Sequence, residues 1–302
     1  MKPLTTTMIT AAAVACVLAG TTGPASAIVG GQEAPHTYPG MGSMNITYPG
    51  IGVDQCDTAL IDPEYVLTAA HCVSDFTVAP TVAPVAAGQI TVRIGTTSRS
   101  TGGQVATGKK VLLQPDWAWL TNAGLPATDI ALVQLDRPLH GPYMPVVGWS
   151  SAHRRGPVRL IGWGLTQFPV PPGSPLPDQL RQRDVVQLPA SACAGGGITT
   201  GEICVSQGAC FGDSGGPALR QLPARHGRSQ GWVSIGIASR ETSETDPCGA
   251  PTIYTDPGTY RQWIAQTIAT GKTAPNRHTG VTAPTVQAAT TSRPTFLMTT
   301  SR

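Results

Sequence analysis

The chain has 302 residues, of which 40% are hydrophobic and 12% charged, and it contains 35 glycines and 28 prolines. This composition favours many turns and short strands over long charged helices, and the length allows one large or two small hydrophobic cores. The formal net charge is only +3 and no run of lysines and arginines occurs, which argues against a nucleic-acid-binding protein.

Residues 1–27 have the pattern of a secretory signal peptide. Lys2 supplies the positive charge, an apolar run from Met8 to Ala19 follows, and Ala25-Ser26-Ala27 has the form of a cleavage site. The apolar run is too short to span a bilayer comfortably. A lipoprotein anchor on Cys16 is a poor alternative, because cleavage there would cut the apolar run itself. We therefore expect a secreted, extracellular protein with no membrane attachment after signal removal.

Six cysteines remain once the signal peptide is removed. An even number in an exported chain predicts three disulfides, although six cysteines allow 15 pairings. Zinc binding is the competing use of cysteine, but no Cys-x-x-Cys pair occurs, so we expect no metal site and no cofactor. The six are Cys56, Cys72, Cys193, Cys204, Cys210 and Cys248.

The mature chain would begin Ile28-Val29-Gly30-Gly31 and has its first clear strand at Tyr65–Thr68. Residues 69–72 are expected to turn off the end of that strand, and they include His71. A single histidine next to a disulfide is more often structural than catalytic, so His71 needs support from elsewhere in the chain.

A short alternating run at Gln89–Gly95 predicts another strand, and the apolar run Ile130–Leu135 predicts a buried one. Asp129 stands at the entrance of the buried strand, and taken alone it is more often a turn or capping residue. Residues 136–155 are rich in proline and glycine and are expected to cross over between two halves of the protein.

The second half contains further short strands, a proline-rich surface loop at 168–178 and one convincing helix. Asp256 is expected to cap the helix, Pro257 suits its first turn, and Gly271 ends it. Residues 272–302 are mostly Thr, Ser, Pro and Ala, which predicts a disordered tail. The strands are expected at Val158–Gly164, Val185–Leu188, Glu202–Val205 and Gly231–Gly236.

The stretch Gly212–Pro217 places Ser214 between an acidic residue and two glycines. Glycine adopts the backbone angles that let neighbouring N–H groups point at one spot, and such N–H pairs stabilise the negative oxygen formed in acyl transfer. Ser214 is therefore a candidate nucleophile. A serine hydroxyl needs a base and a group that orients the base, so the remaining chain must supply both.

Three motifs stand in the order His, Asp, Ser: Thr68-Ala69-Ala70-His71-Cys72, Asp129-Ile130-Ala131-Leu132 and Gly212–Pro217. Together with Ile-Val-Gly-Gly after the cleavage site, they resemble the chymotrypsin-like (trypsin-type) serine endopeptidases. The resemblance covers residues 28–271. It implies an all-β fold of two six-stranded antiparallel β-barrels, with the active site in the cleft between them and a single C-terminal helix.

The resemblance also implies the roles of individual residues. Ser214 would be the nucleophile, His71 the general base and then acid, and Asp129 the residue that orients the imidazole. The N–H groups of Gly212 and Ser214 would form the oxyanion hole. A free Ile28 terminus would pair with Asp213, and because Ile28 directly follows the signal cleavage site, we expect no separate zymogen.

The same resemblance selects a disulfide pairing and a specificity pocket. The pairs would be Cys56–Cys72, Cys193–Cys204 and Cys210–Cys248. Gly208 would lie at the pocket floor, where trypsin-like enzymes have an aspartate, and Ser234-Ile235-Gly236 would pair with the substrate. With Thr252 narrowing the pocket, the residue before the scissile bond (P1) is expected to be neutral, apolar and small to medium in size.

The partners implied are protein or peptide substrates and a protein inhibitor of proteases. The protein itself is expected to be a monomer. A second hypothesis is a non-catalytic relative used for binding, but such proteins normally lose a triad residue and this chain keeps all three. An esterase of the α/β-hydrolase type is excluded by the chain order, because that family runs Ser, acid, His.

Overall fold

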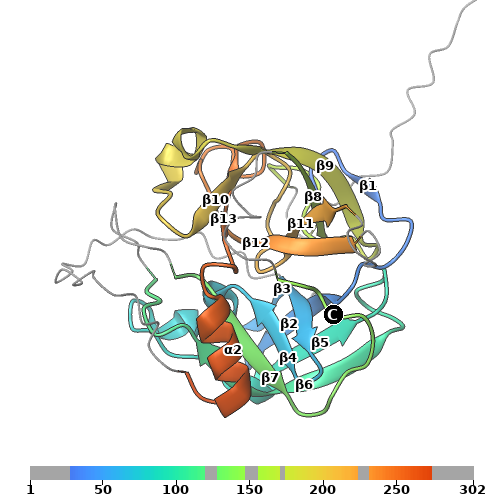
Figure 1. Ribbon diagram of the computed structural model, residues 1–302, viewed down its shortest axis with the longest axis vertical. Helices are drawn as coiled ribbons and strands as arrows, with labels where there is room; N and C mark the ends of the chain where they lie inside the picture. Colours follow the sequence, from blue (N-terminus) through green and yellow to red (C-terminus); the bar gives the residue numbers. More distant parts are fainter. Residues whose placement is uncertain (1–27, 120–127, 147–155, 171–173, 224–230, 274–302) are drawn as a thin grey trace, which may run out of the picture.

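The computed structural model describes residues 28–119, 128–146, 156–170, 174–223 and 231–273. These residues form two closed six-stranded antiparallel β-barrels and a single α-helix near the C-terminal end, as expected from the sequence (Figure 1). The expected signal peptide, nearly all of the expected tail and part of the expected crossover lie outside the described residues.

The first barrel has the strand order β2-β3-β4-β7-β6-β5, and pairing of β5 with β2 closes it. Its interior is filled by large apolar side chains such as Met44, Leu60 and Leu132, each with 0% exposure. The strands are β2 (Met41–Tyr48), β3 (Gly52–Asp62), β4 (Tyr65–Thr68), β5 (Ile90–Ile94), β6 (Gln104–Leu113) and β7 (Ala131–Leu135).

The second barrel has the order β9-β10-β13-β12-β11-β8, closed by pairing of β8 with β9, and the short strand β1 (Gln32–Glu33) adds to β9 outside the closed ring. Its strands are β8 (Pro157–Gly162), β9 (Arg181–Leu188), β10 (Glu202–Val205), β11 (Pro217–Leu222), β12 (Gly231–Glu241) and β13 (Thr252–Thr255).

The barrels meet through a shared apolar cluster. It joins Met41 and Ala59 of the first barrel to Ile161 and Leu219 of the second, with Trp163 buried among them. In Figure 1 the two barrels lie one above the other, and the labelled strands of each form a separate group. The contact surface of the barrels is therefore itself a packed core.

Helix α2 (Arg261–Thr270) packs on the first barrel through Trp263 and Ile264, beside β7 in Figure 1. It ends at Gly271 in the left-handed conformation, as expected, but begins later than the sequence suggests. Asp256 accepts a hydrogen bond from the N–H of Gly258 and so shapes a turn before the helix. None of the helices among the described residues is long and apolar enough to cross a membrane.

Within the described ranges, four short 3-10 helices lie in the connections, and three disulfides link loops and strand ends. The pairs are those that the resemblance selects: Cys56–Cys72, Cys193–Cys204 and Cys210–Cys248. The 3-10 helices are η1 (Ala70–Val73), η2 (Phe76–Val78), η3 (Ala87–Gln89) and η4 (Ala190–Gly196).

Candidate active site

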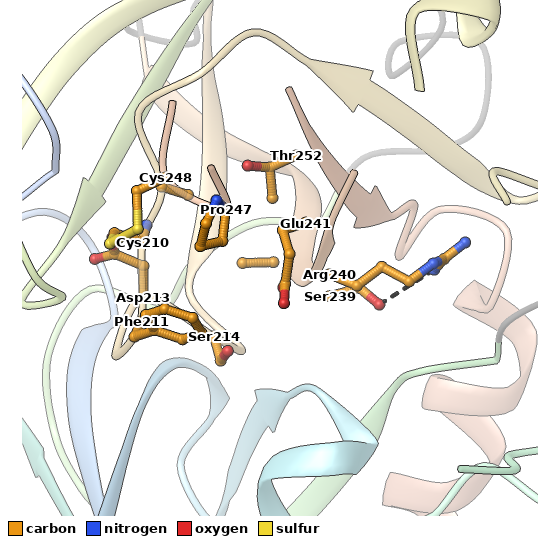
Figure 2. A pocket seen from close by; sticks show the side chains of 12 residues that line it. Cys210, Phe211, Asp213, Ser214, Ser239, Arg240, Glu241, Pro247, Cys248 and Thr252 are labelled. Atoms are coloured by element: carbon orange, nitrogen blue, oxygen red, sulfur yellow. Dashed lines mark hydrogen bonds between the residues drawn. A yellow bond between two sulfur atoms is a disulfide. The ribbon is translucent and has the colours of Figure 1, made fainter. Parts of the chain in front are cut away.

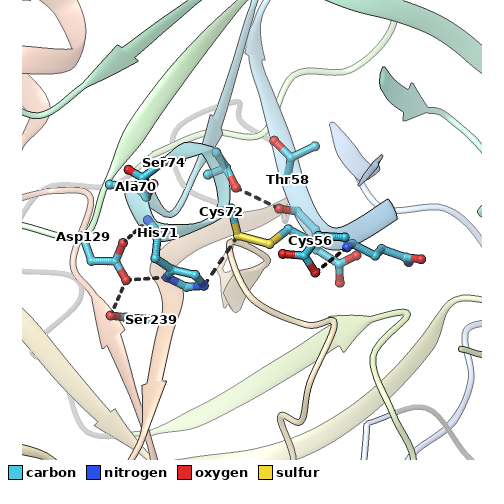
Figure 3. The surroundings of a disulfide bond; sticks show 12 residues. Cys56, Thr58, Ala70, His71, Cys72, Ser74, Asp129 and Ser239 are labelled. Atoms are coloured by element: carbon cyan, nitrogen blue, oxygen red, sulfur yellow. Dashed lines mark hydrogen bonds and ion pairs between the residues drawn. A yellow bond between two sulfur atoms is a disulfide. The ribbon is translucent and has the colours of Figure 1, made fainter. Parts of the chain in front are cut away.

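The pairing of β4 with β7 brings His71 and Asp129 together. Thr68, at the end of β4, lies opposite Ala131, at the start of β7. The chain therefore leaves β4 into η1, which carries His71, at the point where Asp129 precedes β7. His71 Nδ1 lies 2.8 Å from Asp129 Oδ2, and the His71 backbone N–H donates to Asp129 Oδ1 at 2.9 Å (Figure 3).

Asp129 is almost completely buried and is held by both barrels. Ser239, in β12, donates its hydroxyl to Asp129 Oδ2 at 2.7 Å, and Thr255, at the end of β13, donates to the Asp129 carbonyl at 3.1 Å. Burial acts to raise the pKa of Asp129, but the charge of His71 and the hydrogen bonds from His71 and Ser239 outweigh it and lower that pKa. The carboxylate therefore stays ionised and fixes the orientation of the imidazole.

Sequence reasoning missed Ser239. It is 8% exposed and its hydroxyl completes the hydrogen bonding of a buried carboxylate. In the sequence it lies beyond the strand expected at Gly231–Gly236, and no local pattern distinguishes it from Ser234.

Ser214 lies in a tight turn that leads into β11. Gly212 and Gly215 on either side have φ values of 98° and 76°, which L side chains rarely adopt. The Ser214 carbonyl accepts a hydrogen bond from the N–H of Asp57 in β3 at 2.8 Å, and the Gly215 N–H donates to Ala238 in β12 at 2.9 Å. The turn is therefore fixed to both barrels.

The N–H groups of Gly212 and Ser214 are left free by this turn: among the described residues, neither donates to another protein group. No hydrogen bond joins Ser214 to His71 in the described part of the chain, and His71 Nε2 lies 3.6 Å from Cys72 Sγ instead. Hydrogen bonds between nucleophile and base often form only once substrate is bound.

Asp213 is 2% exposed and turns away from solvent. It accepts hydrogen bonds from Gly164 N–H at 2.8 Å and from Cys210 N–H at 2.9 Å. Burial raises the pKa of Asp213 to about 7. Ile28 is also buried, with 1% exposure, and the next residue, Val29, donates its N–H to the Gly208 carbonyl at 2.8 Å.

A small pocket of about 40 Å³ opens beside Ser214. Figure 2 shows Arg240 pointing away from Ser214, because its guanidinium is bound to the buried Glu202 by two hydrogen bonds. The Glu241 side chain lies beside the pocket and is exposed. The lining residues are Ala209, Cys210, Phe211, Asp213, Ser214, Ala238, Ser239, Arg240, Glu241, Pro247, Cys248 and Thr252.

This lining corrects part of the expected pocket. Thr252 is in the wall as expected, but Ser234 and Ile235 have 0% exposure and lie inside the second barrel. A Cβ on Gly236 would meet Tyr254, which also places Gly236 in the packed interior. The segment of β12 that lines the pocket is residues 238–241.

The expected floor residue, Gly208, also lies outside the pocket lining. A Cβ at this position would be 3.0 Å from Leu160 Cδ1 and 3.5 Å from Ile28 Cγ2. Gly208 therefore packs against the segment that begins at Ile28.

Comparison with known proteins agrees with this geometry. The family model described as Trypsin matches residues 28–264. The chain is also similar to Proproteinase E of Bos taurus, with 28% identity over 268 residues that cover 82% of this chain and 96% of that protein. The family match extends across the two barrels and includes His71, Asp129 and Ser214.

Proposed function

The chain belongs to the trypsin family of serine endopeptidases, and from that premise we propose that it hydrolyses peptide bonds through an acyl-enzyme on Ser214. His71 removes the proton of the Ser214 hydroxyl as Ser214 attacks the substrate carbonyl, and then passes this proton to the leaving amine. Asp129 keeps the imidazole in the tautomer that has Nε2 free to accept. The free N–H groups of Gly212 and Ser214 bind the oxyanion.

One observation supports this assignment above all others. Ser239 and Ser214 line the same pocket, and Ser239 is hydrogen-bonded to Asp129, which in turn holds His71. The nucleophile and the His–Asp pair are thus connected through one small site, although they come from different barrels.

The assignment is tested with Ser214→Ala and a fluorophosphonate probe, which reacts with activated serines. The wild-type protein should be labelled and should cleave peptides, whereas Ser214→Ala should be unlabelled. Related enzymes that lose a triad residue keep only about 10³–10⁴-fold catalysis over water. Wild-type peptidase activity in Ser214→Ala would show that the nucleophile is another residue.

We further propose that activity depends on a free amine at Ile28, which would pair with Asp213. Ile28 has a φ of 54°, a strained value for a β-branched residue. Cutting the bond before Ile28 abolishes this torsion and its strain. Signal peptidase would itself make the cut, so the secreted protein would be active from the start. Sequencing of the secreted protein should begin at Ile28, and full activity in an untrimmed, extended chain would refute the dependence.

For specificity, we propose a neutral P1 residue of small to medium apolar size. The pocket volume of about 40 Å³ is small, Thr252 occupies its wall, and the carboxylate of Glu241 is exposed and screened by water. Mass spectrometry of a cleaved peptide library gives the preference directly. A strong preference for Arg or Lys would contradict the proposal and would implicate Glu241.

We also propose that the protein acts outside the cell as a monomer on protein or peptide substrates. The three disulfides support an oxidising compartment. Sedimentation of the secreted protein tests its monomeric state, and a protein inhibitor of proteases remains a predicted partner.

A further inference from the structure

A second buried carboxyl group lies beside Asp213. Asp57, in β3 of the first barrel, has 0% exposure. Asp213 Oδ1 and Asp57 Oδ2 both lie within 2.5 Å of the point that a Cβ on Gly162 would occupy. The two carboxyl groups, one from each side of the barrel contact, therefore lie next to each other in the space that a side chain at Gly162 would fill.

Hydrogen-bond donors are distributed unevenly over this pair. Asp213 accepts from two N–H groups, those of Gly164 and Cys210. Asp57 Oδ2 accepts only from Trp163 N–H, at 3.2 Å, and Asp57 Oδ1 has no partner among the described residues. A buried polar atom without a hydrogen-bond partner costs free energy, so Asp57 is the member of the pair that still lacks a hydrogen-bond donor.

No positive group is hydrogen-bonded to either carboxyl group in the described part of the chain. Arg99 acts on Asp57 only through space, because its guanidinium is bound to Gln55 and to main-chain carbonyls. The remaining titratable neighbour, Tyr254, is uncharged when protonated. Burial and the charge of Asp213 raise the pKa of Asp57 well above its usual range. The pair therefore keeps a proton at pH values at which two isolated carboxyl groups would both be ionised.

The N-terminal segment of the mature chain lies against this site. Ile28 belongs to the same apolar cluster as Leu160 and Ala209, which directly precedes Cys210. Val29 is hydrogen-bonded to Gly208 in the same segment. A free amine at Ile28 would bring one positive charge and three N–H donors to a place that has two carboxyl groups and too few donors.

We propose that Asp57 is a second acidic partner of the Ile28 ammonium, shared with Asp213, and that it holds a proton as long as residue 28 is joined to the chain before it. The proposal rests on the proposed activation by a free Ile28. When the ammonium enters, it replaces the proton, which passes to solvent. Asp57 is a positioning residue, because its own N–H holds the Ser214 carbonyl at 2.8 Å.

The test uses Asp57→Asn, which keeps the size of the side chain and removes its charge. Two chains are compared, one beginning at Ile28 and one extended by Ala25–Ala27, both with Ser214→Ala to prevent self-digestion. At pH 8 the substitution should raise the Tm of the extended chain by roughly 2–4 °C, because an amide is neutral at every pH, whereas Asp57 must take up a proton at a pH above its ordinary pKa. It should lower the Tm of the chain beginning at Ile28 by a similar amount, because it removes a partner of the ammonium.

A purely structural role for Asp57 would shift both Tm values in the same direction, and that result, or no shift in either chain, would overturn the proposal. Asp256→Asn is the matched control, since Asp256 is equally buried but lies beside α2. Its effect should be the same in both chains.

The Ser214→Ala chains with Asp57 intact give a second measurement that does not depend on folding of the variant. Carboxyl groups with raised pKa values stabilise the fold below their ordinary pKa and lose that contribution as pH rises through the raised value, about 7 for Asp213. The Tm of the extended chain should therefore fall between pH 5 and pH 8 more steeply than that of the chain beginning at Ile28. Equal slopes would contradict the proposal.

Peptidase assays on the two chains with Ser214 intact separate this proposal from the activation itself. If the extended chain were fully active, the activation proposal would fail. The opposite Tm shifts would still report whether Asp57 binds the ammonium.

Discussion

Ser239→Ala should lower kcat by about tenfold, because the hydroxyl of Ser239 supports the ionised Asp129 in the active site. A hydrogen bond to a charged group contributes about 1.5–3 kcal/mol, which corresponds to roughly 10–150-fold in rate if all of it is lost in the transition state. Asp129 keeps two hydrogen bonds from His71, at 2.8 and 2.9 Å, so we expect the lower end of that range. Because the hydrogen bond from Ser239 lowers the pKa of Asp129, its loss raises that pKa. As the pH is lowered, the variant should therefore lose activity at a higher pH than the wild-type protein does.

The assay is the pH profile of kcat and of kcat/KM on one peptide substrate. Ser239→Thr keeps the hydroxyl and should retain most of the activity. Ser234→Ala is the matched control, because Ser234 lies in the same strand but its hydroxyl donates to the Gly236 carbonyl, at 3.3 Å, and not to Asp129. If Ser234→Ala lost more activity than Ser239→Ala, the assignment of residues 238–241 to the pocket would be wrong.

Three further substitutions test the supports of the site. Gly215→Ala would force a φ of 76° on a residue with a Cβ and press that atom on Thr68, so we expect about 1–3 kcal/mol of destabilisation in a thermal scan. Arg240→Met should lower the free energy of unfolding in urea by about 3–5 kcal/mol, because Glu202 is left buried without its partner, and adding Glu202→Gln should restore much of it. Thr252→Gly should raise kcat/KM for larger P1 residues while the isosteric Thr252→Val should not; equal effects of both would show that the hydroxyl, and not the volume, sets the preference.

The fold and the His–Asp pair could be predicted because their signals are local. Short strands, turns and the strand before His71 follow from residue type, and the order of the three motifs identified the barrel topology. The contact between His71 and Asp129 then follows from the pairing of β4, which ends just before His71, with β7, which begins just after Asp129.

The position of the substrate-facing segment could not be predicted in the same way. Ser234-Ile235-Gly236 resembles the Ser-Trp-Gly segment of the family, but β12 continues to Glu241 and its pairing with β13 shifts register between Ala238 and Arg240. A register shift interrupts the strict alternation of inward and outward side chains along a strand.

The buried partner of Asp213 also had no sequence signal. Asp57 is an isolated acidic residue next to a disulfide, and only the packing of β3 against the turn before β11 brings it to Asp213. Contacts of this kind depend on how two barrels dock, which the local pattern of either barrel does not encode.

The hydrogen bonds of Asp129 and Ser214 to the opposite barrel have a consequence for biosynthesis. Each half of the site is held by residues from the other half of the chain, so neither barrel can be catalytic while the other is unfolded. Contacts between residues so distant in sequence form late in folding. A copy in which either barrel is still unfolded has no complete triad and cannot cleave its neighbours, so peptidase activity appears only after the whole two-barrel fold has formed.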